Sequence, residues 1–440
     1  MAPWSRGAAE RAINREMPGV RADLARLIRI PGIAFDGFDH THVERSAAAV
    51  AELAAAADCR PTSSARVGNR RSSGTGPHHP ARTGRTRACT WPSSPGPASP
   101  RHFFSSGWAF RGPPAGYPAR MPITDPLTPV EAGELDSLGA GGSWTVFGRQ
   151  LRVTNLDKVL FPGRDDRPPV TKRDFLRYTA RIAPTLTPYL AGRPLNLHRY
   201  PNGAQTKGFW HKELPAHAPA WLSRWDNPEA DPGETRTYLV ADEPAALVWA
   251  ANFGALEWHP WTSRAEAPHR PTYALVDLDP GPATGWEDVL TLARLHRTAF
   301  EHLGVTARAK VTGRRGIQIW VPIVNGPGFE ETRAWVQELS RTVGAVVPEL
   351  VSWKWQKSDR GGLARLDYTQ NAINRTLVAP YSPRPAPGAP VSAPIGWDEL
   401  DDSALRPDGF TIDDVLERLA ERGDLFHAVL DRPQVLPPLT

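Results

Sequence analysis

The sequence of 440 residues predicts an α+β protein preceded by a largely disordered N-terminal region. From Trp144 onward, short runs rich in β-branched and aromatic residues alternate with helical stretches and are separated by Gly and Pro. Residues 59–120 have no apolar periodicity, so they bury too little apolar surface to offset chain entropy. The predicted segments are a helical remnant at 1–58, a disordered linker at 59–143, a folded domain at 144–400 and a helical tail at 401–440.

The same linker dominates the charge of the chain. The formal net charge is +5, but residues 59–120 contain ten Arg and no Asp or Glu. The remainder of the chain is therefore negative, and the sequence pI of about 9.3 is no evidence for nucleic-acid binding by the folded part. Two interpretations of the segment stay open: a basic nucleic-acid-binding tail, or a GC-rich frame translated out of phase. We favour the second.

Residues 16–58 predict two amphipathic helices around a loop. They resemble the extreme N-terminus of the metal-dependent dipeptidase and aminoacylase family. None of that family's His-x-Asp or Glu-Glu metal-ligand pairs follows, so we expect no peptidase activity. We expect residues 1–120 to be a remnant or a wrongly assigned start, with the working protein beginning near Met121.

Composition excludes several classes of protein. Mean hydropathy is −0.41, and no apolar run approaches the length of about 18 residues needed to span a bilayer. The N-terminus lacks the apolar core of a secretory signal. The two cysteines, Cys59 and Cys89, are too few for a disulfide scaffold or a multi-cysteine zinc site. We therefore expect a cytoplasmic protein.

Within the folded domain, the elements follow from local patterns. Thr171 is a typical N-cap, and Asp174 three residues later favours a helix from there through Tyr178. Further helices are predicted at 286–303 and 330–343, and strands at 272–279, 307–312, 316–322 and 364–367.

Asp277 and Asp279 face the same side of their predicted strand, while Leu278 faces the core. Two carboxylates this close repel each other unless a cation lies between them, and oxygen ligands suit Mg²⁺ or Mn²⁺. The motif also occurs by chance at strand ends. Asp367 ends another apolar run and would complete a three-carboxylate site for two metal ions, although a strand-end cap explains it equally well.

The turn from Thr312 to Gly316 joins two predicted strands. Its glycines would let backbone N–H groups approach an anion, and Arg314 and Arg315 add charge and forked donors. These features fit a triphosphate. An ordinary hairpin turn with exposed arginines is the alternative.

Taken in order, these motifs resemble the polymerase domain of bacterial DNA ligase D, a branch of the archaeo-eukaryotic primase superfamily. The resemblance covers about residues 144–400 and includes Thr154–Pro162, Gly192–Pro194, Arg199–Gly203, Phe209–Lys212, Ala255–His259, Asp277–Asp279, Thr312–Gln318, Asp367–Asn371 and Ala379–Arg384. It implies primase-like mixed sheets flanked by helices. It also implies a nucleotidyltransferase that fills gaps or extends DNA ends in non-homologous end joining.

The resemblance also implies roles for particular residues. Asp277, Asp279 and Asp367 would be catalytic and bind two Mn²⁺ or Mg²⁺ ions. The residues implied to surround the incoming NTP or dNTP are His259, Thr312, Gly313, Arg315, Gly316, Gln318, Gln370 and Arg384. The residues implied to hold a DNA 5′-phosphate are Asn155, Lys158 and Lys172, although a lysine is more often a solvated charge. Phe209 and Trp210 would stack on a base, with core packing of one of them as the alternative.

Gln318 departs from the family pattern, which usually has His in this turn. Glutamine donates hydrogen bonds but cannot become cationic, so a non-catalytic module that binds the DNA 5′-phosphate remains the alternative function. The run from Lys357 to Arg360 ends in Arg and not in the Gly of a Lys-x-Asp-Gly ligase motif, and no His-rich nuclease segment is present. We therefore predict a stand-alone, monomeric polymerase module, with Ku and an ATP-dependent DNA ligase supplied by other chains.

Overall fold

The computed structural model describes residues 125–439 apart from 166, 232, 325 and 355, and all of these belong to one compact unit. The predicted remnant at 1–58 and most of the predicted linker lie outside the described residues. The end of that linker was predicted wrongly, because helix α3 (Pro129–Ser137) and the start of strand β1 (Gly141–Val146) lie before residue 144. Thr128 and Glu131 form a capping box on α3, and the Trp144 indole donates to the Glu131 carbonyl at 2.8 Å.

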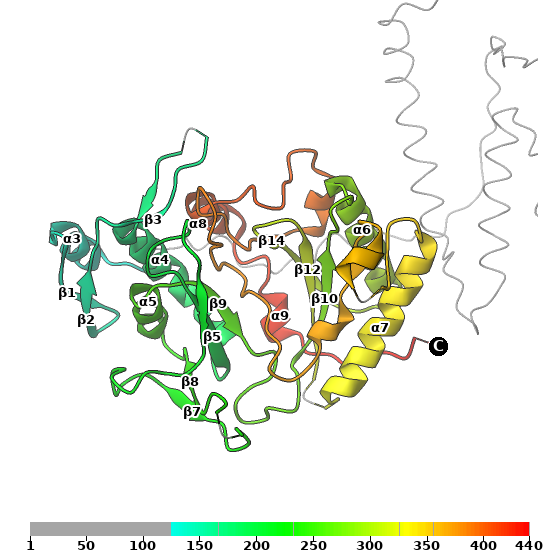
Figure 1. Cartoon of the computed structure of the whole chain (residues 1–440), viewed down its shortest axis with the longest axis horizontal. Coiled ribbons are helices and arrows are strands. Elements are labelled where there is room, and N and C mark those ends of the chain that lie inside the picture. Colours follow the sequence, from blue (N-terminus) through cyan, green and yellow to red (C-terminus); the bar gives the residue numbers. More distant parts are fainter. Residues whose placement is uncertain (1–124, 166, 232, 325, 355, 440) are drawn as a thin grey trace, which may run out of the picture. The chain divides into compact units, whose positions relative to one another are not determined.

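One five-stranded antiparallel sheet has the order β13-β10-β12-β11-β14 (Figure 1). Its strands are β10 (Tyr273–Asp279), β11 (Arg308–Val311), β12 (Ile317–Pro322), β13 (Arg365–Leu366) and β14 (Pro394–Ile395). Helices α6 (Trp286–Leu303) and α7 (Phe329–Val346) pack on β10. The four predicted strands agree with the structure to within one residue at each end.

The second sheet has the order β6-β5-β8-β7, and β9 also pairs with β5. Its strands are β5 (Pro194–Arg199), β6 (Phe209–His211), β7 (Arg224–Asp226), β8 (Thr237–Val240) and β9 (Ala255–Pro260). Helices α4 (Lys172–Leu190) and α5 (Pro244–Asn252) pack on each other, and α5 contacts β9. Two-stranded ribbons join β1 to β2 (Arg149–Thr154) and β3 (Val159–Phe161) to β4 (Val170–Thr171).

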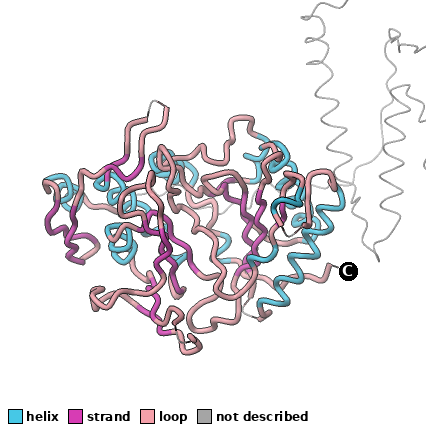
Figure 2. The backbone as a smooth tube through the Cα atoms, viewed as in Figure 1, coloured by secondary structure: helices cyan, strands magenta, loops and turns pink. Residues whose placement is uncertain are grey.

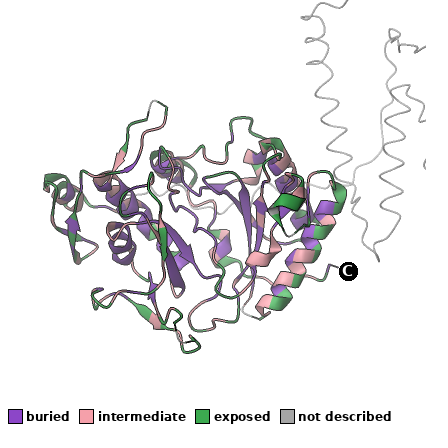
Figure 3. Ribbon diagram, in the orientation of Figure 1, coloured by how far each residue is buried: buried purple, intermediate pink, exposed green. Residues whose placement is uncertain are grey.

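Both sheets contribute to a core of large aromatic side chains, and their strands are mostly buried whereas the outer faces of α6 and α7 are exposed (Figure 3). Phe175 of α4 stacks on Trp258 of β9, with ring centroids 6.0 Å apart and an interplanar angle of 9°. Trp320 of β12 meets Phe426 edge-to-face at 5.6 Å. Phe175 and Trp320, which lie in the predicted helix and strand, thus pack each sheet against the segment that covers it.

The C-terminal segment was predicted as a helical tail starting at residue 401, and the structure places it in the folded body (Figure 2). The helices of this segment are α8 (Ile412–Arg422) and α9 (Ala428–Asp431). Before and at its start, short 3-10 turns occur at Lys357–Arg360 (η1), Tyr368–Gln370 (η2) and Trp397–Asp401 (η3). Asp424 accepts hydrogen bonds from Tyr189 at 2.7 Å and from Tyr381 at 2.6 Å. Among the described residues, no helix has the length and apolar character needed to cross a membrane.

Candidate active site

Strand β10 presents two aspartates on one face, as its alternating pattern predicts. Leu278 between them is 1% exposed, and Asp277 and Asp279 are both partly buried. The strand is paired on both sides, so Asp277 lies opposite Gln318 of β12 and Asp279 lies opposite Arg365 of β13. This pairing fixes the direction of both carboxylates.

Asp277 has few partners that favour its charged form. The Gln318 amide Nε2 donates to its Oδ1 at 3.1 Å, and no ion pair of Asp277 is present in the part of the chain that the structure describes. Burial raises the pKa of Asp277 to about 7, and the nearby charges of Asp279 and Asp367 act in the same direction. The carboxylate therefore has no direct cationic partner among the described residues, and the charge of Lys310 acts on it from beyond Gln318.

Asp367 follows β13 beside this pair, and its backbone N–H donates to the Asp277 carbonyl at 2.8 Å. Its carboxylate is occupied locally: Thr369 donates from its backbone and hydroxyl, Gln370 donates at 3.0 Å, and Arg365 lies at 3.2 Å. Burial alone would raise the pKa of Asp367, but these contacts outweigh it and hold the pKa below its ordinary value. Asp367 is thus adjacent to the pair and satisfied by its own turn.

A cavity of about 250 Å³ opens between the acids and the turn after β11. It is lined by Asp277, Leu278, Asp279, Pro280, Thr312, Arg314, Arg315, Gly316, Gln318 and Arg384. The Thr312 hydroxyl accepts from the N–H groups of Arg314 and Gly316, so these two N–H groups close the turn. The arginine side chains therefore carry the positive character of the cavity.

Two glycines permit this close packing. Gly313 has φ +68°, and a Cβ there would lie 2.6 Å from Arg384 Cγ. A Cβ on Gly316 would lie 2.4 Å from the Leu278 carbonyl of β10. Any larger residue at either position would separate the turn from the arginine or from the acidic strand.

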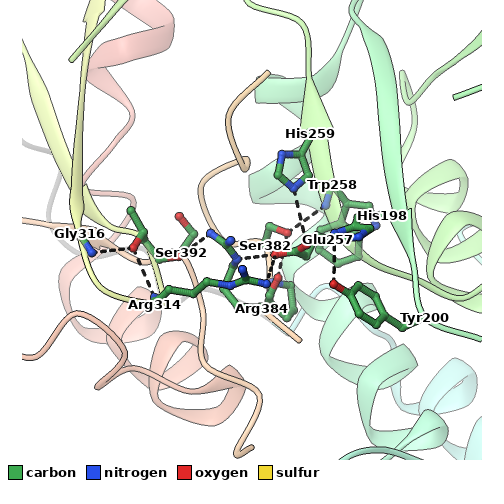
Figure 4. A network of polar contacts seen from close by, with 12 residues as sticks. His198, Tyr200, Glu257, Trp258, His259, Arg314, Gly316, Ser382, Arg384 and Ser392 are labelled. Carbon is green, nitrogen blue, oxygen red and sulfur yellow. Dashed lines mark hydrogen bonds and ion pairs between the residues drawn. The ribbon is translucent and has the colours of Figure 1, made fainter. Parts of the chain in front are cut away.

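Glu257 of β9 ties the other sheet to this cavity (Figure 4). It is 1% exposed, and its Oε1 accepts from Arg384 Nε at 2.5 Å while Arg384 also donates to the Thr312 carbonyl at 2.8 Å. His198 donates to Oε2 at 2.5 Å, and Arg314 lies 3.6 Å away. Burial would raise the pKa of Glu257, but the hydrogen bond from His198 and the charge of Arg384 hold it well below its usual value.

An exposed aromatic pair lies at the outer end of this network. Phe209 and Trp210 of β6 are 46% and 50% exposed, so neither packs in the core. Trp210 stacks on His198 with centroids 4.4 Å apart, and His259 meets its edge at 4.8 Å. One face of Trp210 is therefore braced by the residue that binds Glu257.

A separate pair of lysines lies near β4. Lys158 Nζ donates to the Pro201 carbonyl at 2.7 Å and to Asn202 at 3.1 Å, and Lys172 donates its backbone N–H to the Lys158 carbonyl. Burial, with the neighbouring Lys158, lowers the pKa of Lys172 to about 8. Asn155, in the same turn, has φ +56°. Two ammonium groups without a carboxylate partner among the described residues fit an anion.

Residues 171–426 match the family model described as the LigD primase-polymerase domain. The chain belongs to this LigD family. A LigD protein of Mycobacterium bovis, named a multifunctional non-homologous end joining protein, is 33% identical over 285 residues, or 63% of this chain and 36% of the relative. A bifunctional LigD of Bacillus subtilis is 30% identical over 66% of this chain and 45% of its own length.

A solved structure agrees with the LigD assignment. The polymerase domain of Mycobacterium tuberculosis ligase D in complex with DNA is 31% identical, with a TM-score of 0.58, and the match covers 64% of this chain and 99% of that chain. The predicted primase-like fold and the predicted family are thereby confirmed. The chain spans less than half the length of these curated LigD relatives.

The LigD residues predicted from the sequence are brought together in part. Asp277, Asp279, Thr312, Arg315, Gly316, Gln318 and Arg384 line one cavity, whereas Gln370 binds Asp367 and His259 lies beside Glu257. Among residues that the structure describes, no group of three or more His, Cys, Asp or Glu is arranged to hold a metal ion. Asp277 and Asp279 nevertheless fit one, because a buried carboxylate with acidic neighbours needs a cation. The ligand roles stay predictions.

Three residues of this LigD site were missed by the sequence reasoning: Glu257, His198 and Lys310. Each is a polar residue in a strand that also carries apolar residues, and this mixture was the weak signal available. Glu257 was noted only as part of a motif. Lys310 is fully buried and donates to Gln318 at 2.5 Å.

Proposed function

We propose that this chain is a template-directed nucleotidyltransferase that extends DNA ends or fills gaps during repair by non-homologous end joining. The observation that carries the proposal is the Asp277 and Asp279 pair, short of a cation, on a cavity whose opposite wall holds arginines. A site that must bind both a cation and a polyphosphate needs this combination. The names of the LigD relatives support the repair role.

The arginines bind the triphosphate of an NTP or dNTP. Arg384 is held by Glu257 and the Thr312 carbonyl, so its remaining donors have a fixed direction. Arg315 donates to the Pro280 carbonyl at 3.2 Å, beside the acidic strand. A polyphosphate between these groups has its α-phosphate directed toward the aspartates, where a primer 3′-hydroxyl attacks and pyrophosphate leaves.

Asp277 and Asp279, with Asp367 as the third predicted ligand, would hold two Mn²⁺ or Mg²⁺ ions, whose charge stabilises the developing negative charge on the phosphate and the leaving group. The Oδ1 atom of Asp367 is occupied by Thr369 and Arg365, whereas Oδ2 accepts only from Gln370 among the described residues and keeps a lone pair for a cation.

DNA binds on the surface that carries the lysines and the aromatic pair. Lys158 and Lys172 hold a 5′-phosphate, and Phe209 and Trp210 stack on a base. The related mycobacterial polymerase domain was solved with DNA, which supports DNA binding by this chain. Ku and a separate DNA ligase would act from other chains, and we propose that the module works as a monomer.

Primer extension by the full-length chain tests the proposal. With Mn²⁺, a nucleotide pool and a gapped, 5′-phosphorylated DNA, the wild-type protein should extend the primer. Asp277→Ala should abolish extension while gel-shift binding of the same DNA persists. Asp413→Asn, an exposed aspartate at the start of α8, serves as the matched control and should extend normally. Extension by Asp277→Ala would refute the role of this aspartate.

A non-catalytic DNA-end-binding module is the second candidate. It is favoured by Gln318 in place of the usual His and by the local engagement of Asp367. Binding that prefers 5′-phosphorylated over 5′-hydroxyl ends, lost in Lys172→Met, without extension of any primer under any metal, would establish this function instead.

A further inference from the structure

Lys310 is the one fully buried lysine among the residues whose burial the structure describes, and it lies on β11, separated from the acidic strand β10 by β12. Its ammonium donates to Gln318 Oε1 at 2.5 Å and to Ser392 Oγ at 2.7 Å. It also lies 5.6 Å from the centre of the Trp320 ring. In the described part of the chain no carboxylate forms an ion pair with it, so its burial needs another explanation.

The hydrogen-bond donors and acceptors around Lys310 fix the direction of each contact. The Ser392 hydroxyl donates to the Val311 carbonyl at 3.2 Å, so its oxygen accepts from Lys310. Burial, with the charge of Arg384, lowers the pKa of Lys310 well below its usual value, and Nζ donates to the Gln318 oxygen, so that oxygen faces the lysine. The Gln318 Nε2 group then faces Asp277, to which it donates at 3.1 Å.

Sheet register makes this arrangement a property of the fold. Gln318 lies opposite Asp277 on one side and opposite Lys310 on the other, because β12 runs between β10 and β11. Gln318 is 5% exposed. Its donor to Asp277 occupies Oδ1, and no described residue donates a hydrogen bond to Oδ2.

We propose that Lys310 and Gln318 are positioning residues for Asp277: the lysine orients the glutamine amide, and the amide holds one carboxylate oxygen so that the other faces a divalent cation. This inference rests on the proposed function. It gives Gln318 a task other than contacting nucleotide phosphates. Without Lys310 the Gln318 oxygen would lose its one donor among the described residues, and the amide would be held only by its hydrogen bond to Asp277.

Equilibrium binding of Mn²⁺ to the full-length chain without nucleotide or DNA tests this inference, with free Mn²⁺ measured by its electron paramagnetic resonance signal. Loss of such supporting contacts typically weakens metal binding 10–100-fold. Lys310→Met and Gln318→Met should each weaken Mn²⁺ binding about tenfold or more. The double variant should be no weaker than Gln318→Met alone, because the lysine acts through the glutamine.

Arg315→Gln is the comparison variant, because Arg315 lines the cavity from the phosphate side. It should raise the KM for nucleotide and leave Mn²⁺ binding unchanged, the opposite pattern to Lys310→Met. Gln318→His, which keeps a donor toward Asp277, should weaken Mn²⁺ binding less than Gln318→Met. Circular dichroism and thermal melting establish that each variant is folded.

Ser392→Ala decides the question if Lys310→Met does not fold, since it removes only the second acceptor of the lysine. A modest loss of Mn²⁺ affinity supports the inference. Wild-type Mn²⁺ affinity in Lys310→Met overturns the inference. If Lys310→Met does not fold, wild-type Mn²⁺ affinity in Ser392→Ala overturns it. A Gln318→Met variant that changes only the nucleotide KM also overturns it. If wild-type Mn²⁺ binding is absent or insensitive to Asp277→Asn, the proposed function fails together with the inference.

Discussion

Glu257 is a buried carboxylate and Asp277 a partly buried one at the same site, but the two sheets surround them in opposite ways. Glu257 on β9 accepts hydrogen bonds from His198 and Arg384 at 2.5 Å each. Asp277 on β10 accepts one from the neutral Gln318 amide and has acidic neighbours. The pKa of Glu257 is accordingly held well below its usual value, whereas burial raises the pKa of Asp277 to about 7.

The difference in partners distinguishes a carboxylate that joins parts of the fold from one that is free to bind a ligand. The protein supplies the cations of Glu257 from its own side chains, so this carboxylate joins β9 to Arg384 and the turn at Thr312. It gives Asp277 no ion pair within the described residues, and Lys310 acts on it only from beyond Gln318. A carboxylate of the second kind is the one that a bound cation would stabilise, in keeping with the proposed function, although both residues are carboxylic acids in the sequence.

Removing the charge of Glu257 should have the largest effect on stability. Glu257→Gln leaves Arg384 buried without its ion pair and should lower the free energy of unfolding by about 3 kcal/mol. It should also raise the nucleotide KM. Urea unfolding at pH 7 measures the first effect. Glu243→Gln, which breaks the half-exposed pair with Arg149, is the control and should cost less than about 1 kcal/mol. Equal losses in the two variants would contradict the comparison.

The matching change at the other carboxylate should have the opposite sign. Asp277→Asn removes a buried charge that lacks a cation and should raise the metal-free free energy of unfolding by about 2 kcal/mol at pH 8. The same change should abolish Mn²⁺ binding. Urea unfolding with a chelator checks the first expectation, with Asp413→Asn as the reference. A destabilised Asp277→Asn protein would show that Asp277 has internal partners after all.

The two carboxylates should change the stability of the protein in different pH ranges and in opposite directions. The folded state keeps Asp277 protonated up to a pKa of about 7, against 3.8 in the unfolded chain, so it binds more protons between these values. Metal-free stability should therefore fall as pH rises from about 4 to about 7, by roughly 2 kcal/mol. Glu257 acts oppositely, since its contribution is present above about pH 4.5 and is lost as pH falls through its lowered pKa. Saturating Mn²⁺ or Asp277→Asn should flatten the decline above pH 4. A decline that persists in Asp277→Asn would assign it to other groups.

The smallest expected effect lies at the outer end of the Glu257 network. Trp210→Ala should weaken single-stranded DNA binding by about 1 kcal/mol through lost stacking. Mn²⁺ binding at the other carboxylate should stay unchanged. Fluorescence anisotropy with a labelled oligonucleotide measures the first quantity, and Trp353→Ala, an exposed tryptophan far along the chain, is the control. Equal losses in both variants would remove the special role of Trp210.

The strands of the acidic sheet were predictable because each is a short apolar run bounded by Gly, Pro or charge. That pattern located Asp277 and Asp279 on one face, and the structure confirms it. Helix α4 was predicted only to Tyr178, yet it continues through Pro184 and Pro188 to Leu190, because tertiary packing outweighs the cost of proline within the helix. Helix α3 was missed because Leu135 is its one buried residue, so it shows no apolar periodicity.

The partners of buried charges were not predictable from the sequence. Lys310 finds Gln318 within the same hairpin, but its other partner, Ser392, is 82 residues away. Glu257 and Arg384 are separated by 127 residues. Such pairs depend on sheet register and on which loops return to the site, and a local pattern carries neither. The local engagement of Asp367 by Thr369 and Gln370 likewise depends on the turn η2.

The complete burial of Lys310 also makes it an internal reporter in chemical labelling. Reagents that acylate accessible amines should modify exposed lysines such as Lys207 and leave Lys310 untouched while β11 and β12 stay paired. Labelling at Lys310 requires an opening of the sheet beside the acids, so its rate reports the local unfolding free energy of the site. Mass spectrometry of a single lysine thereby follows the integrity of the acidic strand without a nucleotide, a metal or an activity assay.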